Sequence, residues 1–305
     1  MSLKDVGASV QRRLFNHAKT HGESNQRILT RFAIERLLYR LGRTAAASER
    51  YMLKGAMLFV TWPQHALRPT GDLDLLGHGN PDPDAIGQLF FEICTVDYLA
   101  DGIVFDPKTI SVEPTRADDI YQGIRLTLRA RLGTAVIPVQ VDIGFGDSVF
   151  PHPKRRAFPC LLPEMPAAAL LMYPPETVIA EKFETMVRFG EATSRMKDFH
   201  DIWVTTRTFD FDLATLVQAV GGTLTRRHVV APTGIPFALT PDFGEMPDKQ
   251  SMWTGFLRRS PPALPPPPLA IVLEDLRRFF GPVIATLTLP ESAKGAWSHD
   301  RALWA

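Results

Sequence analysis

Two neighbouring stretches of the chain alternate apolar and polar residues, as strands with one buried face do. Within residues 119–132, Ile124, Leu126 and Leu128 fall on one face, and residues 135–145 carry an apolar side chain at every second position from Val139 on. Gly133-Thr134 separates the two stretches as a short turn. The pattern predicts a β-hairpin, and a shorter strand is expected at 104–113.

Apolar residues at helical spacing predict helices on both sides of this hairpin. These helices are expected over residues 5–20, 25–42, 85–99 and 269–281. Residues 146–175 are expected to be loop-rich, and the chain is expected to be helical from Pro174 onward. The run PPALPPPP at 261–268 predicts a stiff linker, and the tail after Pro290 is expected to be loosely held.

Residues 52–76 join an apolar helix to a strand that carries two carboxylates. Lys54-Gly55-Ala56 begins the helix, and Arg68-Pro69-Thr70-Gly71 has the residues of a turn. Because side chains alternate along a strand, Asp72 and Asp74 are predicted to point to the same side. Two adjacent carboxylates favour a bound cation, and oxygen ligands suit Mg²⁺. The start of the preceding helix offers backbone N–H groups to a phosphate.

Two helical blocks supply further charged candidates. Lys182 shares a helix face with apolar residues, which favours an anionic partner, although a lysine at the edge of a core helix would look the same. Asp198 and Asp201 share a face of the next helix, with Arg195 and Lys197 at ion-pair spacing. A pair of surface ion pairs is the alternative interpretation.

Asp142 projects from the second hairpin strand, on the face opposite the apolar residues. It is a candidate third carboxylate beside Asp72 and Asp74. Its spacing alone is equally consistent with a solvent-facing strand residue.

In their order along the chain, these blocks resemble motifs of the AbiEii/AbiGii-type toxin nucleotidyltransferases, within the DNA polymerase β-like superfamily. The resemblance rests on Lys54-Gly55-Ala56, the Arg68–Asp74 run, Pro175–Glu184 and Ser194–Trp203. It covers about residues 50–260. Gly55-Ala56 departs from the usual Gly-Ser or Gly-Gly, which removes a hydroxyl but keeps the backbone N–H groups.

The resemblance implies an α/β (α+β) fold with a mixed sheet, helices on one side, and a helical C-terminal region. It predicts three parts: N-terminal helices at 1–50 that pack on the core, a nucleotidyltransferase core at 51–173, and a helical region at 174–305.

The resemblance also implies roles for individual residues. The catalytic set is Asp72, Asp74, Lys182 and Asp198. Nucleotide binding is assigned to Lys54, Gly55, Ala56, Arg68, Thr70 and Lys182. Asp72, Asp74 and Asp142 would hold Mg²⁺ or Mn²⁺, and Asp201 would be a helix cap or a supporting residue.

The implied activity is transfer of a nucleotide from an NTP to tRNA, which would block translation and growth. The implied partner is a separately encoded antitoxin. Two alternatives stay open: nucleotide transfer to a protein side chain, and a non-catalytic NTP-binding regulator.

Composition limits how the protein could bind RNA and in which compartment it is expected. A net charge of +1 over 305 residues excludes a polycation, so RNA contacts would need a local basic surface. Candidates for that surface are the arginines of helix 25–42 (Arg27, Arg31, Arg36, Arg40 and Arg43), the strand arginines Arg125, Arg129 and Arg131, and Lys154-Arg155-Arg156. For the helix and the lysine–arginine run, a solvated surface is the alternative. Cys94 and Cys160, with no signal peptide or membrane span, predict a cytoplasmic protein.

Overall fold

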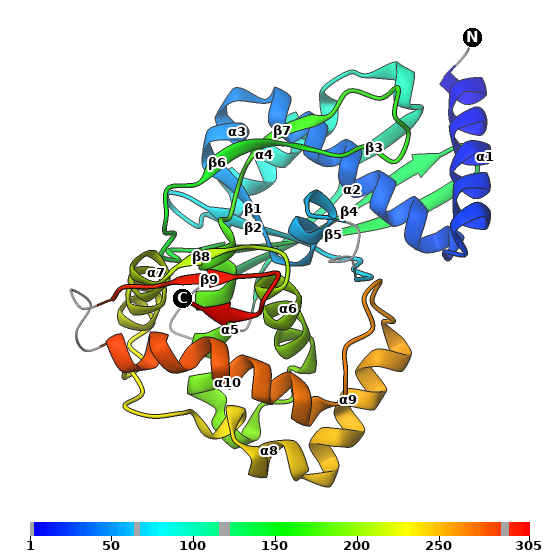
Figure 1. Ribbon diagram of the computed structural model, residues 1–305. Coiled ribbons are helices and arrows are strands. Elements are labelled where there is room, and N and C mark those ends of the chain that lie inside the picture. The colour runs from blue at the N-terminus through cyan, green and yellow to red at the C-terminus, as the bar shows by residue number, and fades with distance from the viewer. Residues whose placement is uncertain (1–2, 64–67, 116–122, 288–292) are drawn as a thin grey trace. The chain divides into compact units, whose positions relative to one another are not determined.

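A computed structural model describes residues 3–63, 68–115, 123–287 and 293–305 of the chain (Figure 1). The chain divides into two compact units. Unit 1 contains residues 1–61, 70–146 and 154–172, and unit 2 contains residues 62–69, 147–153 and 173–305.

Unit 1 combines helices with one large sheet. Its helical elements are α1 (Leu3–His21), α2 (Asn25–Arg43), α3 (Ala45–Arg50), η1 (Gly55–Thr61), α4 (Pro83–Thr95) and η3 (Leu99–Asp101). Its strands are β1 (Tyr51–Lys54), β2 (Leu73–Gly77), β3 (Ile103–Thr115), β4 (Gly123–Leu132), β5 (Ala135–Phe145), β6 (Lys154–Phe158) and β7 (Ala168–Met172).

Among the described residues, these strands form one seven-stranded sheet in the order β3-β4-β5-β2-β1-β7-β6. Parallel pairs (β2 with β5, β1 with β7) lie beside antiparallel ones, so the predicted mixed sheet is confirmed. The predicted hairpin is β4–β5; residues 119–122 of its expected first strand lie outside the described residues.

One face of this sheet is covered. α2 packs on β5 and β7, α4 packs on β3, and α1 lies against α2 (Figure 1). The covered face carries the buried residues Ile124, Leu126 and Leu128 of β4 and Val139 and Val141 of β5. The opposite face carries the polar side chains of the same strands. The alternation in the sequence therefore separates a core face from a polar face.

Some elements of unit 1 differ from those expected. The loop-rich segment 146–175 also contains β6 and β7, which were not predicted, because strands of five residues leave little local signal. The helix expected to begin at Lys54-Gly55-Ala56 is a 3₁₀ helix that begins at Gly55, and it follows strand β1, which was not predicted. The helix expected to reach Leu99 ends at Thr95.

Two arginines of α2, Arg36 and Arg40, are buried. Both interpretations of the helix arginines, a basic surface for RNA and a solvated helix face, are therefore wrong for these two residues. Arg40 donates to both carboxylate oxygens of Asp101, at 2.7 and 3.2 Å, and Arg36 donates to the same carboxylate at 3.2 Å. All three side chains are buried. This ion group ties α2 to the segment that begins β3, and it removes Arg36 and Arg40 from the RNA-binding candidates.

Unit 2 is mainly helical. Its helical elements are α5 (Pro175–Phe189), η4 (Gly190–Ala192), α6 (Met196–Thr206), α7 (Leu213–Arg226), η5 (Phe237–Leu239), α8 (Pro241–Glu245), α9 (Pro247–Arg259) and α10 (Leu269–Thr286). A small sheet adds β8 (Phe211–Asp212), β9 (Ala296–Ser298) and β10 (Leu303–Trp304).

The proline-rich run at 261–268, predicted to be a linker, lies between α9 and α10 within unit 2. The expectation of a loosely held tail was wrong. The tail is held by β9, β10 and the buried Trp297, whose indole N–H donates to the Thr206 carbonyl at 2.7 Å. Residues 288–292 lie outside the described part. None of the described helices is long and apolar enough to cross a lipid bilayer.

Candidate active site

Four charged residues form a row across the sheet of unit 1, on the face away from α2 and α4. Arg125 of β4 lies opposite Asp142 of β5, and Asp142 lies beside Asp74 of β2. Asp74 in turn lies opposite Lys54 of β1. Residues paired across neighbouring strands direct their side chains to the same face. Two carboxylates therefore occupy the middle of the row, with a cation at each end.

Two neighbouring side chains, Arg125 and Gln140, donate hydrogen bonds to the Asp142 carboxylate. Arg125 donates to its two carboxylate oxygens at 2.8 and 3.0 Å, and Gln140 Nε2 donates to Oδ2 at 3.0 Å. The hydrogen bond from Arg125 to Asp142 and the charge of Asp142 raise the pKa of Arg125, and the charge of Asp72 adds to the effect. Over the described part of the chain, no three His, Cys, Asp or Glu side chains already converge on one metal position.

Gly55 makes room for the Asp74 carboxylate. Its φ is +70°, and a Cβ built on it would lie 2.0 Å from Asp74 Oδ2. Such a distance is impossible for non-bonded atoms, so only glycine fits here without moving Asp74. The next residue, Ala56, is buried. The sequence motif Lys54-Gly55-Ala56 thus has a steric reason in addition to its expected role at a phosphate.

Gly55→Ala is expected to lower the free energy of unfolding by about 1–3 kcal/mol, because alanine is strained at this φ. It should also abolish most activity, because the new methyl group displaces Asp74. Gly22→Ala is the matched control: Gly22 has φ +65° but no atom within 4 Å of its Cβ position. Thermal unfolding and nucleotide-transfer assays on both variants check this. Activity in Gly55→Ala equal to that in Gly22→Ala would contradict the steric role.

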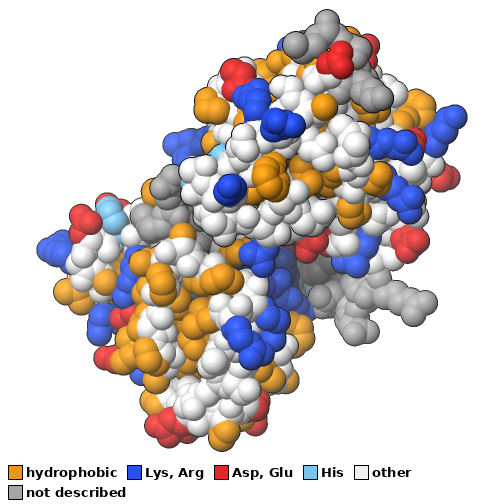
Figure 2. All heavy atoms as spheres, turned by 90° about the vertical axis from the view of Figure 1, so that its right-hand side faces the viewer, with side chains coloured by type: hydrophobic (Ala, Val, Ile, Leu, Met, Phe, Trp, Pro, Cys, Tyr) orange, Lys and Arg blue, Asp and Glu red, His pale blue; other side chains and the backbone are white. Residues whose placement is uncertain are grey.

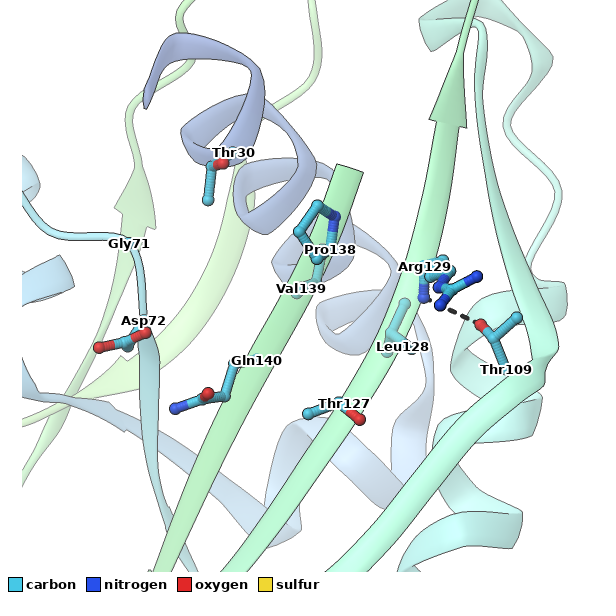
Figure 3. A pocket seen from close by; sticks show the side chains of 10 residues that line it. All are labelled: Thr30, Gly71, Asp72, Thr109, Thr127, Leu128, Arg129, Pro138, Val139 and Gln140. Atoms are coloured by element: carbon cyan, nitrogen blue, oxygen red, sulfur yellow. Dashed lines mark hydrogen bonds between the residues drawn. The ribbon is translucent and has the colours of Figure 1, made fainter. Parts of the chain in front are cut away.

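Asp72 precedes β2 directly, and its side chain is exposed. Thr70 and Gly71 lead into it in an irregular segment. Asp72 lines a pocket of about 770 Å³ in unit 1 (Figure 3). Leu73 and Leu75, which alternate with the two aspartates, are buried, so Asp72 and Asp74 lie on the polar side of the strand, as predicted.

In unit 2, α5 and α6 bring a second set of candidates together. Lys182 Nζ lies 2.6 Å from Asp198 Oδ1 and 2.7 Å from Asp201 Oδ2. Arg68 forms a bidentate pair with Asp201 at 2.6 and 2.8 Å. Arg195 donates to the other oxygen of Asp198 at 2.6 Å. We call these five residues the helix ion cluster.

Burial and charge act in opposite directions within the helix ion cluster. Burial alone would lower the pKa of Lys182, but Asp198 and Asp201 more than offset it, and the pKa lies above its ordinary value. Burial alone would raise the pKa of Asp201, but Arg68 and Lys182 hold it well below its usual range. The pKa of Asp198 is also lowered, against burial, by Lys182 and Arg195. The cluster therefore stays fully ionised at neutral pH.

The contacts agree with part of what the motifs suggested. Asp198 lies against Lys182, so the anionic partner expected for that lysine is present. Asp201 is not paired with Lys197, its nearest candidate on the helix; Arg68 and Lys182 bind it instead. Arg68, expected at the nucleotide, has its guanidinium on Asp201.

The two groups of candidates belong to different units. Asp72, Asp74, Asp142, Thr70 and Lys54-Gly55-Ala56 are in unit 1, and the helix ion cluster is in unit 2.

Sequence reasoning missed Arg125 and Gln140 as partners of Asp142, although a signal was present. A two-residue turn at Gly133-Thr134 fixes the register of the hairpin. Counting back from that turn places Arg125 opposite Asp142. By contrast, the pairing of Asp74 with Asp142 depends on the parallel contact of β2 with β5, which no local pattern reveals.

Comparison with known proteins identifies the fold and the family. The crystal structure of JHP933 from Helicobacter pylori superposes with a TM-score of 0.50 and 14% identity, over 87% of this chain and 94% of that chain. A second crystal structure, of a provisionally assigned nucleotidyltransferase from H. pylori, has a TM-score of 0.51 and 13% identity, over 87% of this chain and 97% of that chain. At this identity the likeness concerns the fold.

No curated protein matches the chain significantly. The family model described as "Nucleotidyl transferase AbiEii toxin, Type IV TA system" matches residues 36–280, which contain both groups of candidate residues. The chain therefore belongs to the AbiEii family of nucleotidyl transferase toxins from type IV toxin–antitoxin systems.

Proposed function

We propose that this protein transfers a nucleotide from an NTP to an RNA acceptor, tRNA in the first place, and thereby blocks translation. Membership of the family implies an NTP substrate and an antitoxin partner. The observation that carries the proposal is the row across the sheet, where Asp74 and Asp142 are neighbours and Gly55 makes room for Asp74. Both substrates are molecules of the cytoplasm, where we place the activity.

The residues present suit a divalent cation, Mg²⁺ or Mn²⁺. Asp72 and Asp74 offer carboxylate oxygens on the polar side of one strand, the ligand type that such cations prefer. Asp142 would join them once Arg125 releases one of its oxygens. A bound cation would neutralise charge on the phosphates and lower the pKa of the acceptor hydroxyl.

The helix ion cluster supports a role at the triphosphate. Among its five residues, three cations face two carboxylates, so one positive charge is in excess. Lys182 keeps part of its side chain exposed, and Asp198 and Asp201 hold its ammonium group in a fixed position. We assign Lys182 of unit 2 to the phosphates. Within unit 1, we assign nucleotide binding to Lys54, Gly55, Ala56 and Thr70. Asp198 positions Lys182, and Asp201 positions both Lys182 and Arg68.

The reaction is a phosphoryl-type displacement. An acceptor hydroxyl oxygen forms a bond to the α-phosphorus of the NTP, the bond from that phosphorus to the bridging oxygen breaks, and pyrophosphate leaves. The hydroxyl proton passes to a neighbouring carboxylate or to water. The chain contributes position and charge, which are the main sources of catalysis in such transfers.

The acceptor is tested by incubating the protein with each of the four NTPs, labelled at the α-phosphate, in the presence of total RNA, tRNA-depleted RNA or a protein extract. Label on RNA of tRNA size, lost on tRNA depletion, is the expected result. Label on protein would refute RNA as the acceptor and favour the protein-modifying alternative. Binding of NTP without any transfer would favour the regulator.

A further inference from the structure

The pocket beside Asp72 lies where β5 extends past the start of β2. The first residue of β2, Leu73, pairs with Val141, whereas β5 already begins at Ala135. Between Ala135 and Gln140, β4 is the only described strand that pairs with β5. The pocket fills this place and continues over β4 (Figure 3). Its volume of about 770 Å³ is within the range of sites for small organic groups.

The lining combines polar groups with the apolar side chains of Leu128, Pro138 and Val139, which suits a nucleoside with its phosphate. Thr30 and Thr127 contribute hydroxyl groups, and Arg129 contributes a cation. The amide nitrogen of Gln140 donates to Asp142 at 3.0 Å, which leaves its amide oxygen to accept from a ligand. Figure 3 shows Thr127, Gln140 and Asp72 following one another across β4, β5 and the segment that leads into β2.

The edge of β5 adds main-chain groups to this lining. In an antiparallel pair, alternate residues turn their N–H and C=O away from the partner strand. One of Val139 and Gln140 therefore turns both groups away from β4, toward the side that β2 leaves open. Such groups can bind the edge of a base or a ribose hydroxyl.

The order of strands indicates whether this pocket binds the nucleoside of the NTP or the nucleoside of the acceptor. Lys54 ends β1 and Gly55 follows it, and we assigned both to the triphosphate. The carboxylates Asp72 and Asp74 lie at β2, and the pocket lies over β5 and β4. In an in-line displacement the attacking and leaving oxygens lie on opposite sides of the phosphorus. With the leaving pyrophosphate on the β1 side, the group that enters from the β5 side is the nucleophile.

We propose that this pocket binds the terminal nucleoside of a single-stranded RNA acceptor and holds its hydroxyl beside Asp72. The inference rests on the proposed nucleotidyl transfer and specifies where the acceptor binds. The hydroxyl of the bound nucleoside forms the new bond to the α-phosphorus, and pyrophosphate departs on the far side.

The polar face of β4 provides a path for the rest of the strand. Arg129 and Arg131 are both exposed and lie two residues apart, about 6.7 Å at the usual rise of a strand. Arg131 is flanked in register by Val104 and Val136, so neither neighbour opposes its charge. Arg125, on the same face, is instead bound to Asp142. On the face drawn in Figure 2, Lys and Arg side chains are scattered among acidic, neutral and hydrophobic ones. An RNA strand would therefore meet short groups of basic side chains, such as Arg129 and Arg131, instead of one broad basic patch.

The test uses the full chain and compares two pocket variants with a control. Arg129→Gln removes the cation, and Thr127→Phe fills the pocket at an exposed strand position that tolerates an aromatic residue. Arg12→Gln removes an equally exposed arginine from α1, outside the pocket. The KM for tRNA, the KM for NTP, and the affinity for a short fluorescent single-stranded RNA are measured for each, together with thermal unfolding.

We expect both pocket variants to raise the KM for tRNA and to weaken binding of the short RNA about tenfold. Arg129→Gln acts through the loss of one charge-assisted contact, and Thr127→Phe acts by occupying the space of the nucleoside. The KM for NTP should not change, and Arg12→Gln should behave as wild type. A raised KM for NTP with unchanged RNA binding would mean that the pocket holds the donor nucleoside. Unchanged values for both would overturn the pocket assignment alone, whereas a wild-type protein that labels no RNA would overturn the proposed function itself.

Discussion

Asp74→Asn is expected to reduce nucleotide transfer about 10³-fold, the size of effect seen when a group that stabilises transition-state charge is removed. Asparagine keeps the shape of the side chain but loses the negative charge that would bind a cation. The fold should be retained, because Asp74 lies next to another carboxylate, Asp142, and the substitution relieves their repulsion.

Transfer rates at saturating NTP and RNA, with thermal unfolding of both proteins, measure this effect. Asp84→Asn, at an exposed position in the first turn of α4, is a control for the loss of one aspartate charge. If Asp74→Asn transferred nucleotides at a rate within a few-fold of the wild-type rate, the assignment of Asp74 would be wrong.

Asp201→Asn is expected to lower the free energy of unfolding by about 3–5 kcal/mol, the usual cost of removing one partner from a buried ion pair. Asp201 is fully buried and holds two cations, Arg68 and Lys182. Without the negative charge of Asp201, the positive charges of Arg68 and Lys182 are less well neutralised inside the protein. Asp300→Asn is the matched control, since the Asp300 side chain is 85% exposed. Denaturant unfolding at pH 7 of the three proteins provides the values.

The same variant should change how stability depends on pH. Asp198 and Asp201 have folded-state pKa values below their unfolded values, so their stabilisation is present above about pH 4 and is lost as the pH falls through the folded pKa. Lys182 has a raised pKa, so its contribution is present below about pH 10 and is lost as the pH rises beyond its folded value. Wild type should therefore lose more stability than Asp201→Asn on acidification from pH 5 to pH 2. Parallel pH profiles of the two proteins would contradict this account of the helix ion cluster.

The parts of the fold that sequence reasoning found are those with strong local patterns. β5 begins and ends at the predicted residues 135 and 145, because its alternation is long and a turn fixes its start. The parts that it missed are strands of two to five residues: β6, β7 and the small sheet of unit 2. Two of their pairings, β7 with β1 and β8 with β9, also join segments far apart in the sequence. Arg36 and Arg40 show the same limit, because the helix pattern does not reveal that Asp101, about sixty residues later, neutralises them.

For the site, motifs identified residues but not their partners. Lys182 and Asp198 were expected together, and they are in contact. The binding of Arg68 by Asp201 was not foreseen, because the two residues are far apart in the sequence and the intrahelical partner Lys197 was nearer. The role of Gly55 beside Asp74 was also hidden, because it depends on the positive φ of one glycine at the end of β1.

The most direct test of the central claim follows the two ends of the triphosphate. The protein is incubated with tRNA and an NTP labelled either at the α-phosphate or at the γ-phosphate, in wild-type and Asp74→Asn forms. The account predicts that wild type transfers the α label to RNA and releases the γ label as pyrophosphate, while Asp74→Asn does neither. Transfer of the γ label to RNA, or equal transfer of the α label by both forms, would contradict it.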